Sequence, residues 1–112
     1  CYDVIHHDMA YLREKLEESD GFLLGSPTIN RDALKPIWDV LSVCDAISNK
    51  GKPVAIFGSY GWSGEACGML AERVNSLKLK LVGEPLKVVF KPTEEDLARC
   101  AVLADDFASA LA

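Results

Sequence analysis

Two short segments hold most of the residues that could grip a small molecule. GSPTINRD (25–32) and GSYGWSGE (58–65) each begin with Gly-Ser directly after an apolar run. Their hydroxyl and amide side chains can donate and accept hydrogen bonds, their glycines let the backbone approach a ligand, and Tyr60 and Trp62 offer flat faces. Neither segment holds a cysteine, a histidine or a Ser–His pair suited to nucleophilic catalysis. The pattern predicts a clamp for a flat, polar-edged ring system, with no catalytic residue.

Simpler interpretations of the second segment stay open. Residues 58–64 could form only a flexible turn, and Trp62 could pack on a neighbouring helix instead of on a ligand. Ser63 is equally suited to cap the helix that follows. Trp38, by contrast, lies in the apolar stripe of a predicted helix, so we expect it in the core.

Both segments follow predicted strands. The runs GFLLG (21–25) and VAIFG (54–58) are typical of strands buried on both faces. Strands alternating with helical patterns predict parallel βαβ units with helices on both faces of the sheet. Ligands bind at the carboxyl ends of such strands, and consecutive strands are usually neighbours, so we expect the two segments to lie side by side.

The remaining elements follow from periodicity and capping signals. We expect a short extended segment at 1–4 and one interrupted strand, or two short ones, over 79–90. A helix from near Asp32 would be capped by that residue, with Pro36 in its first turn. Further helices are predicted from Met9 to before Gly21, over 64–77 and over 93–111. Thr93 and Asp96 would form a capping box, and the last helix would carry an apolar stripe of Leu97, Cys100, Ala101, Ala104, Phe107, Ala108 and Leu111.

Composition narrows the function classes. The 112 residues suit a single domain, and the formal net charge of −5 argues against general nucleic-acid binding. No stretch has the length of an apolar membrane span, so we expect a cytoplasmic protein without membrane contact. The four cysteines are far apart and form no CxxC pair, which predicts reduced thiols and no metal site. His6 and His7 are predicted to be solvated loop residues.

DGFLLGSPTINRDALKPIWDVLS, followed by KGKPVAIFGSYGWSGEA, resembles the flavodoxin-like domain of the flavodiiron (A-type flavoprotein) family. The resemblance continues through VVFKPTEEDL to the last helix. It implies an α/β, flavodoxin-like three-layer sandwich with a parallel sheet, and a bound FMN. It also implies that backbone N–H groups of both loops meet the polar edge of the ring, with Tyr60 or Trp62 against its face. Carried over by position, the residues flanking the isoalloxazine would be Ser26, Pro27, Thr28, Ile29 and Asn30 on one side and Ser59, Tyr60, Gly61, Trp62, Ser63 and Gly64 on the other.

Two parts of the family pattern are not found in the sequence. Residues 1–4 resemble the second strand of the fold, so its first strand, with the loop that cradles the FMN phosphate, has no counterpart here. We therefore expect residues 1–112 to be a partial FMN-binding domain that lacks the N-terminal strand–helix unit, unless another chain supplies the partner strand or the sheet closes up differently. The ligands of the family's di-iron centre are also missing, so this chain alone would not reduce oxygen or nitric oxide.

The resemblance implies an electron-transfer domain. Its FMN would take electrons from a redox donor, such as rubredoxin or a reductase, and pass them to the di-iron centre of an O2/NO reductase. The parent protein would pair head to tail as a homodimer. Two alternatives stay open: an NAD(P)H-dependent flavin or quinone reductase, for which no nucleotide-specific feature is found, and a cofactor-free interaction module on the same fold.

Overall fold

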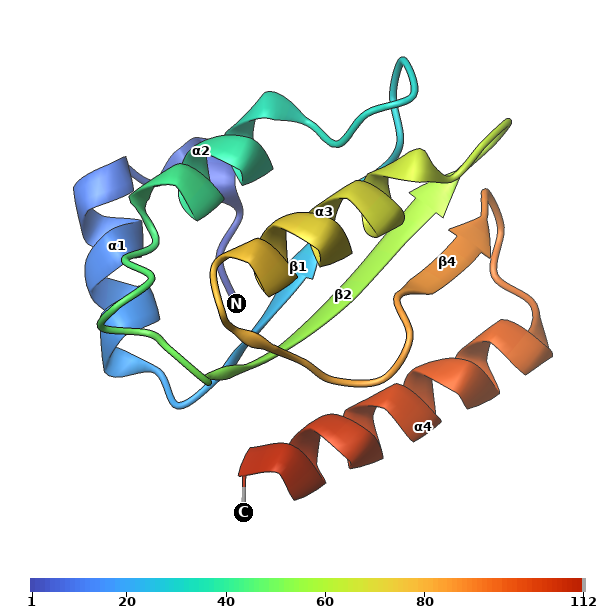
Figure 1. Ribbon diagram of the computed structural model, residues 1–112. Coiled ribbons are helices and arrows are strands. Elements are labelled where there is room, and N and C mark those ends of the chain that lie inside the picture. Colours follow the sequence, from blue (N-terminus) through green and yellow to red (C-terminus); the bar gives the residue numbers. More distant parts are fainter. Residues whose placement is uncertain (112) are drawn as a thin grey trace.

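A computed structural model describes residues 1–111 as a four-stranded parallel sheet with helices on both faces (Figure 1). This confirms the predicted α/β class. Within these residues, no helix combines the length and the apolar character needed to cross a membrane. The elements in chain order are η1 (Val4–His6), α1 (Met9–Glu18), β1 (Phe22–Gly25), α2 (Lys35–Val43), β2 (Pro53–Tyr60), α3 (Glu65–Ser76), β3 (Lys80–Leu81), β4 (Leu86–Val89) and α4 (Glu94–Leu111).

β2 is the central strand of the sheet. β1 pairs with one of its edges, from Phe22 opposite Val54 to Gly25 opposite Phe57. β3 and β4 pair one after the other with its second edge. The segment 79–90 is therefore one interrupted strand line, as predicted, and every pair is parallel because a helix or a long connection returns the chain to the same end of the sheet.

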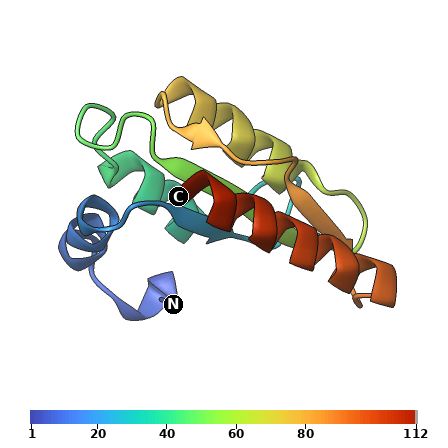
Figure 2. The same ribbon diagram turned by 90° about the horizontal axis from the view of Figure 1, so that it is seen from below.

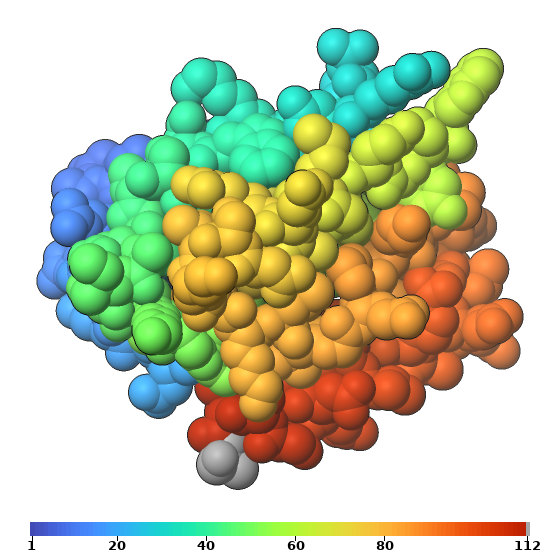
Figure 3. Space-filling view, in the orientation of Figure 1, coloured from blue at the N-terminus to red at the C-terminus, as the bar shows by residue number. Residues whose placement is uncertain are grey.

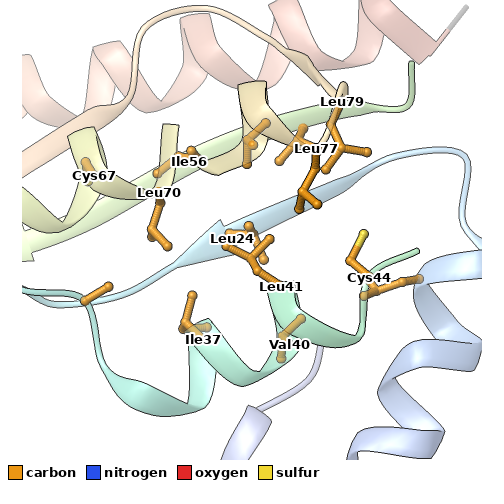
Figure 4. Packing of buried hydrophobic residues seen from close by; sticks show 14 of the residues in the cluster. Leu24, Ile37, Val40, Leu41, Cys44, Ile56, Cys67, Leu70, Leu77 and Leu79 are labelled. Atoms are coloured by element: carbon orange, nitrogen blue, oxygen red, sulfur yellow. The ribbon is translucent and has the colours of Figure 1, made fainter. Parts of the chain in front are cut away.

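Alternation along β2 creates two apolar layers. Val54 and Ile56 face a core built with α1, α2 and α3, whereas Ala55 faces a smaller cluster with α4. In Figure 4, Ile37 and Leu41 of α2 point toward Leu24 of β1. Figure 2 shows α4 on the opposite side of the sheet from α3. The centre of β2 is thus buried on both faces, as predicted.

β1 is not buried on both faces, so the prediction is wrong for this strand. Leu24 belongs to the larger core, but Leu23 points to the α4 side and is 49% exposed. Phe57 of β2, on the same side, is 44% exposed. The reason is that α4 packs on β2 and β4 and leaves the face over β1 open.

Residues 1–4 are not an extended strand segment, which corrects a second prediction. The Asp3 carboxylate accepts a hydrogen bond from the Ile5 N–H, and the Asp3 carbonyl accepts one from His6, so the chain turns into η1. His6 is exposed in this turn. His7 is half-buried and stacks on Tyr11 with ring centroids 5.3 Å apart, so it is not a solvated loop residue.

The predicted cap of α2 is also wrong. α2 begins at Lys35 after Leu34 and ends at Val43, although Pro36 lies in its first turn as expected. The Asp32 carboxylate instead accepts hydrogen bonds from the Ala33 N–H (2.7 Å) and from Trp38 Nε1 (2.9 Å). Trp38 packs half-buried against the core, and Asp32 satisfies its indole N–H.

The start of α4 is confirmed. The Thr93 N–H donates to the Asp96 carboxylate and the Asp96 N–H donates to the Thr93 hydroxyl, a reciprocal capping box. These hydrogen bonds lower the pKa of the Asp96 carboxyl below its usual range, and the bond from the Thr93 N–H has the largest effect. The predicted stripe is confirmed only at Phe107. The buried residues of α4 are Leu103 and Phe107, whereas the other predicted positions are exposed: Leu97, Cys100, Ala101, Ala104, Ala108 and Leu111. Among the described residues all four cysteines are free thiols, as expected.

A single lysine joins the end of α1 to the turn before β2. Lys52 Nζ donates to the carbonyls of Leu16 (2.7 Å) and Glu17 (3.0 Å) and to Asn49 Oδ1 (2.6 Å). The side chain of Asn49 is fully buried and donates to the Asp45 carbonyl. The ammonium group is therefore the donor to the buried Asn49 Oδ1 and to the Glu17 carbonyl, and it shares the Leu16 carbonyl with the Ser19 hydroxyl.

We predict that Lys52→Met lowers the free energy of unfolding by about 2 kcal/mol, because a buried acceptor left without its donor costs about 1–3 kcal/mol. Urea denaturation measures the change. Lys50→Met, at an exposed neighbouring position, should change the value by less than about 0.5 kcal/mol. Equal effects of the two substitutions would contradict the assigned role of Lys52.

Candidate functional site

The two segments singled out by their composition lie side by side. Beyond the last residue of β1, the Ser26 N–H donates to the Phe57 carbonyl (3.2 Å) and the Thr28 N–H donates to the Ser59 carbonyl (2.9 Å). The pairing of β1 with β2 thus continues into the loop. In Figure 3 both loops project from the same edge of the molecule. The predicted juxtaposition is confirmed.

The second loop is shorter than predicted. Gly58, Ser59 and Tyr60 belong to β2, where they pair with residues 87–89 of β4. The strand continues because β4 supplies partners on its second edge, which the local sequence does not reveal. Only residues 61–64 form the connection to α3.

Gly58 lies at the closest approach of the two segments. A β-carbon at this position would lie 2.3 Å from the Ser26 carbonyl oxygen and 2.9 Å from Cys67 Sγ. Since the carbonyl belongs to the backbone, only glycine fits without moving the strands apart. Interpreting residues 58–64 as merely a flexible turn is therefore wrong at its first position.

The hydroxyls of Ser26 and Thr28 are used inside the protein. Ser26 is 4% exposed, and its Oγ donates to the Pro27 carbonyl (2.9 Å) and accepts from the Leu34 N–H (3.1 Å). Thr28 Oγ1 accepts from the Ala66 N–H (3.3 Å) in the first turn of α3. Both side chains therefore shape the first loop and fix it to the start of α3.

The tip of the first loop is a tight two-residue turn. Ile29 and Asp32 exchange two backbone hydrogen bonds of 3.0 Å, and Asn30 and Arg31 between them have φ of 54° and 61°. Two successive positive φ values define a type I′ turn, which favours Asn at the first position but glycine at the second. Without a glycine the sequence did not signal this turn. It presents Ile29 and Asn30 to solvent beside the second loop.

Trp62 lies in solvent, and no neighbour among residues 1–111 buries it. Its side chain is 96% exposed, so the interpretation that it packs on a helix is wrong. Ser63 is not the cap of α3 either, because Gly64 occupies that position without a side-chain hydrogen bond. Within residues 1–111, the N–H groups of Gly61 and Trp62 donate to no protein acceptor. The exposed indole ring of Trp62 therefore lies next to two backbone N–H groups that are free to bind a ligand.

Glu65 fixes a negative charge at the start of α3. A hydrogen bond from the Ser63 hydroxyl lowers the pKa of the Glu65 carboxyl, and its own backbone N–H adds to this, with smaller effects of Arg31 and Lys87. The carboxylate is therefore ionised at neutral pH and already balances the helix dipole. An incoming phosphate would meet this charge, so the start of α3 is not an anion site.

A hollow of about 530 Å³ opens on the α4 side of the sheet, where Ser26 and Pro27 of the first loop and Gly58 and Ser59 of β2 line it. A neighbouring hollow of about 740 Å³ runs along the outer edge of β1. Both are mainly apolar, and both contain Leu23, Pro27 and Phe57. Phe90, just past β4, also lines the first hollow. The sequence did not single out this residue, because its place beside the second loop depends on the pairing of β4 with β2.

The residues present fit a planar heterocycle with a polar edge. The exposed Trp62 offers a face, Gly61 and Trp62 offer N–H donors, and Asn30 offers an amide. Among residues 1–111 no group of three or more His, Cys, Asp or Glu side chains could hold a metal ion. The chemistry on offer is binding and electrostatic tuning of a bound group.

Comparison with known proteins gives consistent relatives, although no family model matches the chain. The flavo-diiron protein FprA2 of Clostridium acetobutylicum is 42% identical over 109 residues, which cover 97% of this chain and 27% of the relative. Rubredoxin oxygen:oxidoreductase from Desulfovibrio gigas superposes with a TM-score of 0.89 at 27% identity, over 96% of this chain and 27% of that one. An archaeal flavodoxin superposes with a TM-score of 0.79 at 30% identity, over 96% of this chain and 73% of that one. The chain thus spans about a quarter of the length of the flavo-diiron relative.

We predict that Gly58→Ala lowers the free energy of unfolding by about 3 kcal/mol, because the added methyl group collides with the Ser26 carbonyl. Urea denaturation, with backbone amide shifts of residues 26–30, measures the effect. Gly68→Ala is the matched control, because a β-carbon there meets nothing within 4 Å, and it should stabilise α3 by about 0.5–1 kcal/mol. If Gly58→Ala is as stable as the wild-type chain, the close approach is not a constraint.

Proposed function

The chain belongs to the flavodoxin-like family and corresponds to the flavodoxin-like part of flavodiiron, or type A, flavoproteins, and from this premise we propose that it binds FMN and transfers electrons. The observation that carries the proposal is the junction of the two loops at the carboxyl ends of β1 and β2. It presents an exposed Trp62 beside free backbone donors. Ligands bind at this edge in open parallel sheets.

The two loops would hold the isoalloxazine from opposite sides. On this proposal Pro27, Ile29 and Asn30 contact it from the first loop, and Trp62 covers one face from the second. The other residues would support the site rather than cover the ring. The hydroxyls of Ser26 and Thr28 accept hydrogen bonds from backbone N–H groups of the protein, and Ser59 and Tyr60 belong to β2. Gly61, Ser63 and Gly64 complete the contact through their main chain.

FMN supplies the redox chemistry when bound, and the protein supplies the environment that tunes it. Backbone N–H groups of residues 61 and 62 would donate to the polar edge of the ring, while Trp62 would exclude water from one face. The Glu65 carboxylate argues that the FMN phosphate lies away from α3, so its anchor is a separate loop. This agrees with the phosphate loop that the sequence was expected to lack.

The donor and acceptor are also proposals. The relative from Desulfovibrio gigas is named a rubredoxin oxygen:oxidoreductase, and the Clostridium relative a flavo-diiron protein. By analogy, we propose that the domain takes electrons from a small redox protein such as rubredoxin, or from a reductase, and passes them to a di-iron centre in the same assembly. A homodimer of the parent would bring the two centres together.

We further propose that residues 1–112 form part of a flavodoxin-like domain whose sheet continues beyond β1. Along the described residues, β1 pairs with β2 alone. The Ser26 N–H points to β2, so by strand alternation the Leu24 N–H does too, whereas the N–H groups of Leu23 and Gly25 point to the open edge. The half-exposed Leu23 and Phe57 form an apolar face at the same edge, which a further strand and helix would cover.

We predict that Trp62→Ala weakens FMN binding by the purified native protein by about tenfold or more, because ring stacking contributes roughly 1–3 kcal/mol. FMN is titrated into the apoprotein and the quenching of flavin fluorescence is measured. Trp62→Phe keeps an aromatic face and should retain most of the affinity and quenching. Unchanged binding and quenching in Trp62→Ala would refute the stacking role. Absence of FMN binding in the wild-type protein would refute the proposed function and favour a cofactor-free module.

For the open edge, we predict slow amide hydrogen exchange at Leu23 and Gly25 in the native protein, because a paired strand protects outward-pointing N–H groups. Leu24 serves as the internal reference, since its N–H is protected by β2 in either case. If Leu23 and Gly25 exchange about as fast as unstructured amides while Leu24 is protected, no strand covers this edge.

A further inference from the structure

Phe90, the residue directly after β4, has an unusual backbone conformation. Its φ is 36°, in a region that bulky side chains rarely adopt, and holding such a residue there costs of order 1–3 kcal/mol. Burial of the ring would ordinarily offset this cost, but the Phe90 side chain is 84% exposed. Burial therefore does not account for a phenylalanine at this position.

Phe90 meets the second loop at two points. Its N–H donates to the Tyr60 carbonyl (2.8 Å), which extends the pairing of β2 and β4 one step past the end of β4. Its ring lies beside Gly61, where a β-carbon would be 3.5 Å from Phe90 Cδ2 and 3.9 Å from Cε2. The ring thus borders the backbone immediately before Trp62.

The loop has little else to hold it at this point. Gly61 and Trp62 are exposed, and their N–H groups donate to no acceptor among residues 1–111. Phe90 also lines the 530 Å³ hollow together with Pro27 of the first loop and Ser59. Phe90 is therefore placed between Gly61 of the second loop and a hollow that the first loop also lines.

We propose that Phe90 is a positioning residue for the second loop: its ring limits the movement of Gly61 and so sets where Trp62 stands. The expected effect on FMN binding rests on the proposed function. The effect on the conformation of the second loop does not, because it can be measured without ligand. A residue with a purely conformational role at a φ of 36° would be replaced best by glycine, which adopts this region without strain. A phenylalanine at this position therefore indicates that the ring itself has a role, because glycine has no side chain.

The experiment separates the ring from the backbone. Phe90→Ala removes the ring, Phe90→Gly removes the ring and relieves the strain, and Phe90→Tyr keeps the ring. Leu97→Ala, at an exposed apolar position of α4, is the matched control. Order parameters of the Gly61 and Trp62 backbone amides are measured by 15N relaxation in the native protein without ligand. FMN affinity and the FMN midpoint potential are then measured.

We expect the backbone order parameters of Gly61 and Trp62 to fall from about 0.85, the value of rigid backbone, to below about 0.6 in both Phe90→Ala and Phe90→Gly, although the glycine variant should be the more stable of the two. FMN affinity should fall about tenfold in both, with a shifted midpoint potential, and Phe90→Tyr and Leu97→Ala should match the wild type. Unchanged order parameters in Phe90→Ala, or a fully ordered loop in Phe90→Gly, would overturn the proposal. If the wild-type protein does not bind FMN, the proposed function fails, while the order parameters still decide the role of Phe90.

Discussion

The structure of the site depends on one main-chain contact, the hydrogen bond from the Thr28 N–H to the Ser59 carbonyl. It continues the β1–β2 ladder past the end of β1, so the first loop leaves the sheet already attached to the second strand. Thr28 then accepts from Ala66, which ties the same residue to α3. The contact is possible only because Gly58 lets the Ser26 carbonyl pass where a β-carbon would stand. A strand, a loop and a helix start are thus fixed by a few atoms.

This constraint explains which residues remain available for a ligand. Ser26 and Thr28 lie nearest the sheet and spend their hydroxyls on the protein, whereas Ile29, Asn30 and Trp62 lie farther out and stay exposed. The division follows from distance to the ladder rather than from residue type. Exposed loop residues on a sheet scaffold suit the recognition of a flat group, because the loop ends can close on the group without moving the sheet.

Sequence patterns predicted what depends on local periodicity and capping: the parallel α/β class, the capping box of α4 and the adjacency of the two loops. They failed where the outcome depends on pairing between distant segments. β2 runs on to Tyr60 because β4 lies alongside, and residues 1–4 turn into η1 because no described strand runs beside them. Asp32 was predicted to cap a helix, but its carboxylate accepts a hydrogen bond from the indole N–H of Trp38, six residues further along the chain. The contact of Phe90 with Gly61 was invisible for the same reason.

Three unfavourable features gather at the edge where the loops leave the sheet. Arg31 and Phe90 hold positive φ, and Trp62 exposes nearly its whole side chain. The positive φ values destabilise the folded chain, the exposed ring adds nothing to its stability, and none of the three residues belongs to the buried core. Strain and exposed aromatic surface that the fold does not require are most simply explained by a binding role. Lys78 also has a positive φ and Ile47 is 89% exposed elsewhere, but at this junction strained residues lie beside an exposed aromatic ring, which is the physical argument that the site lies there.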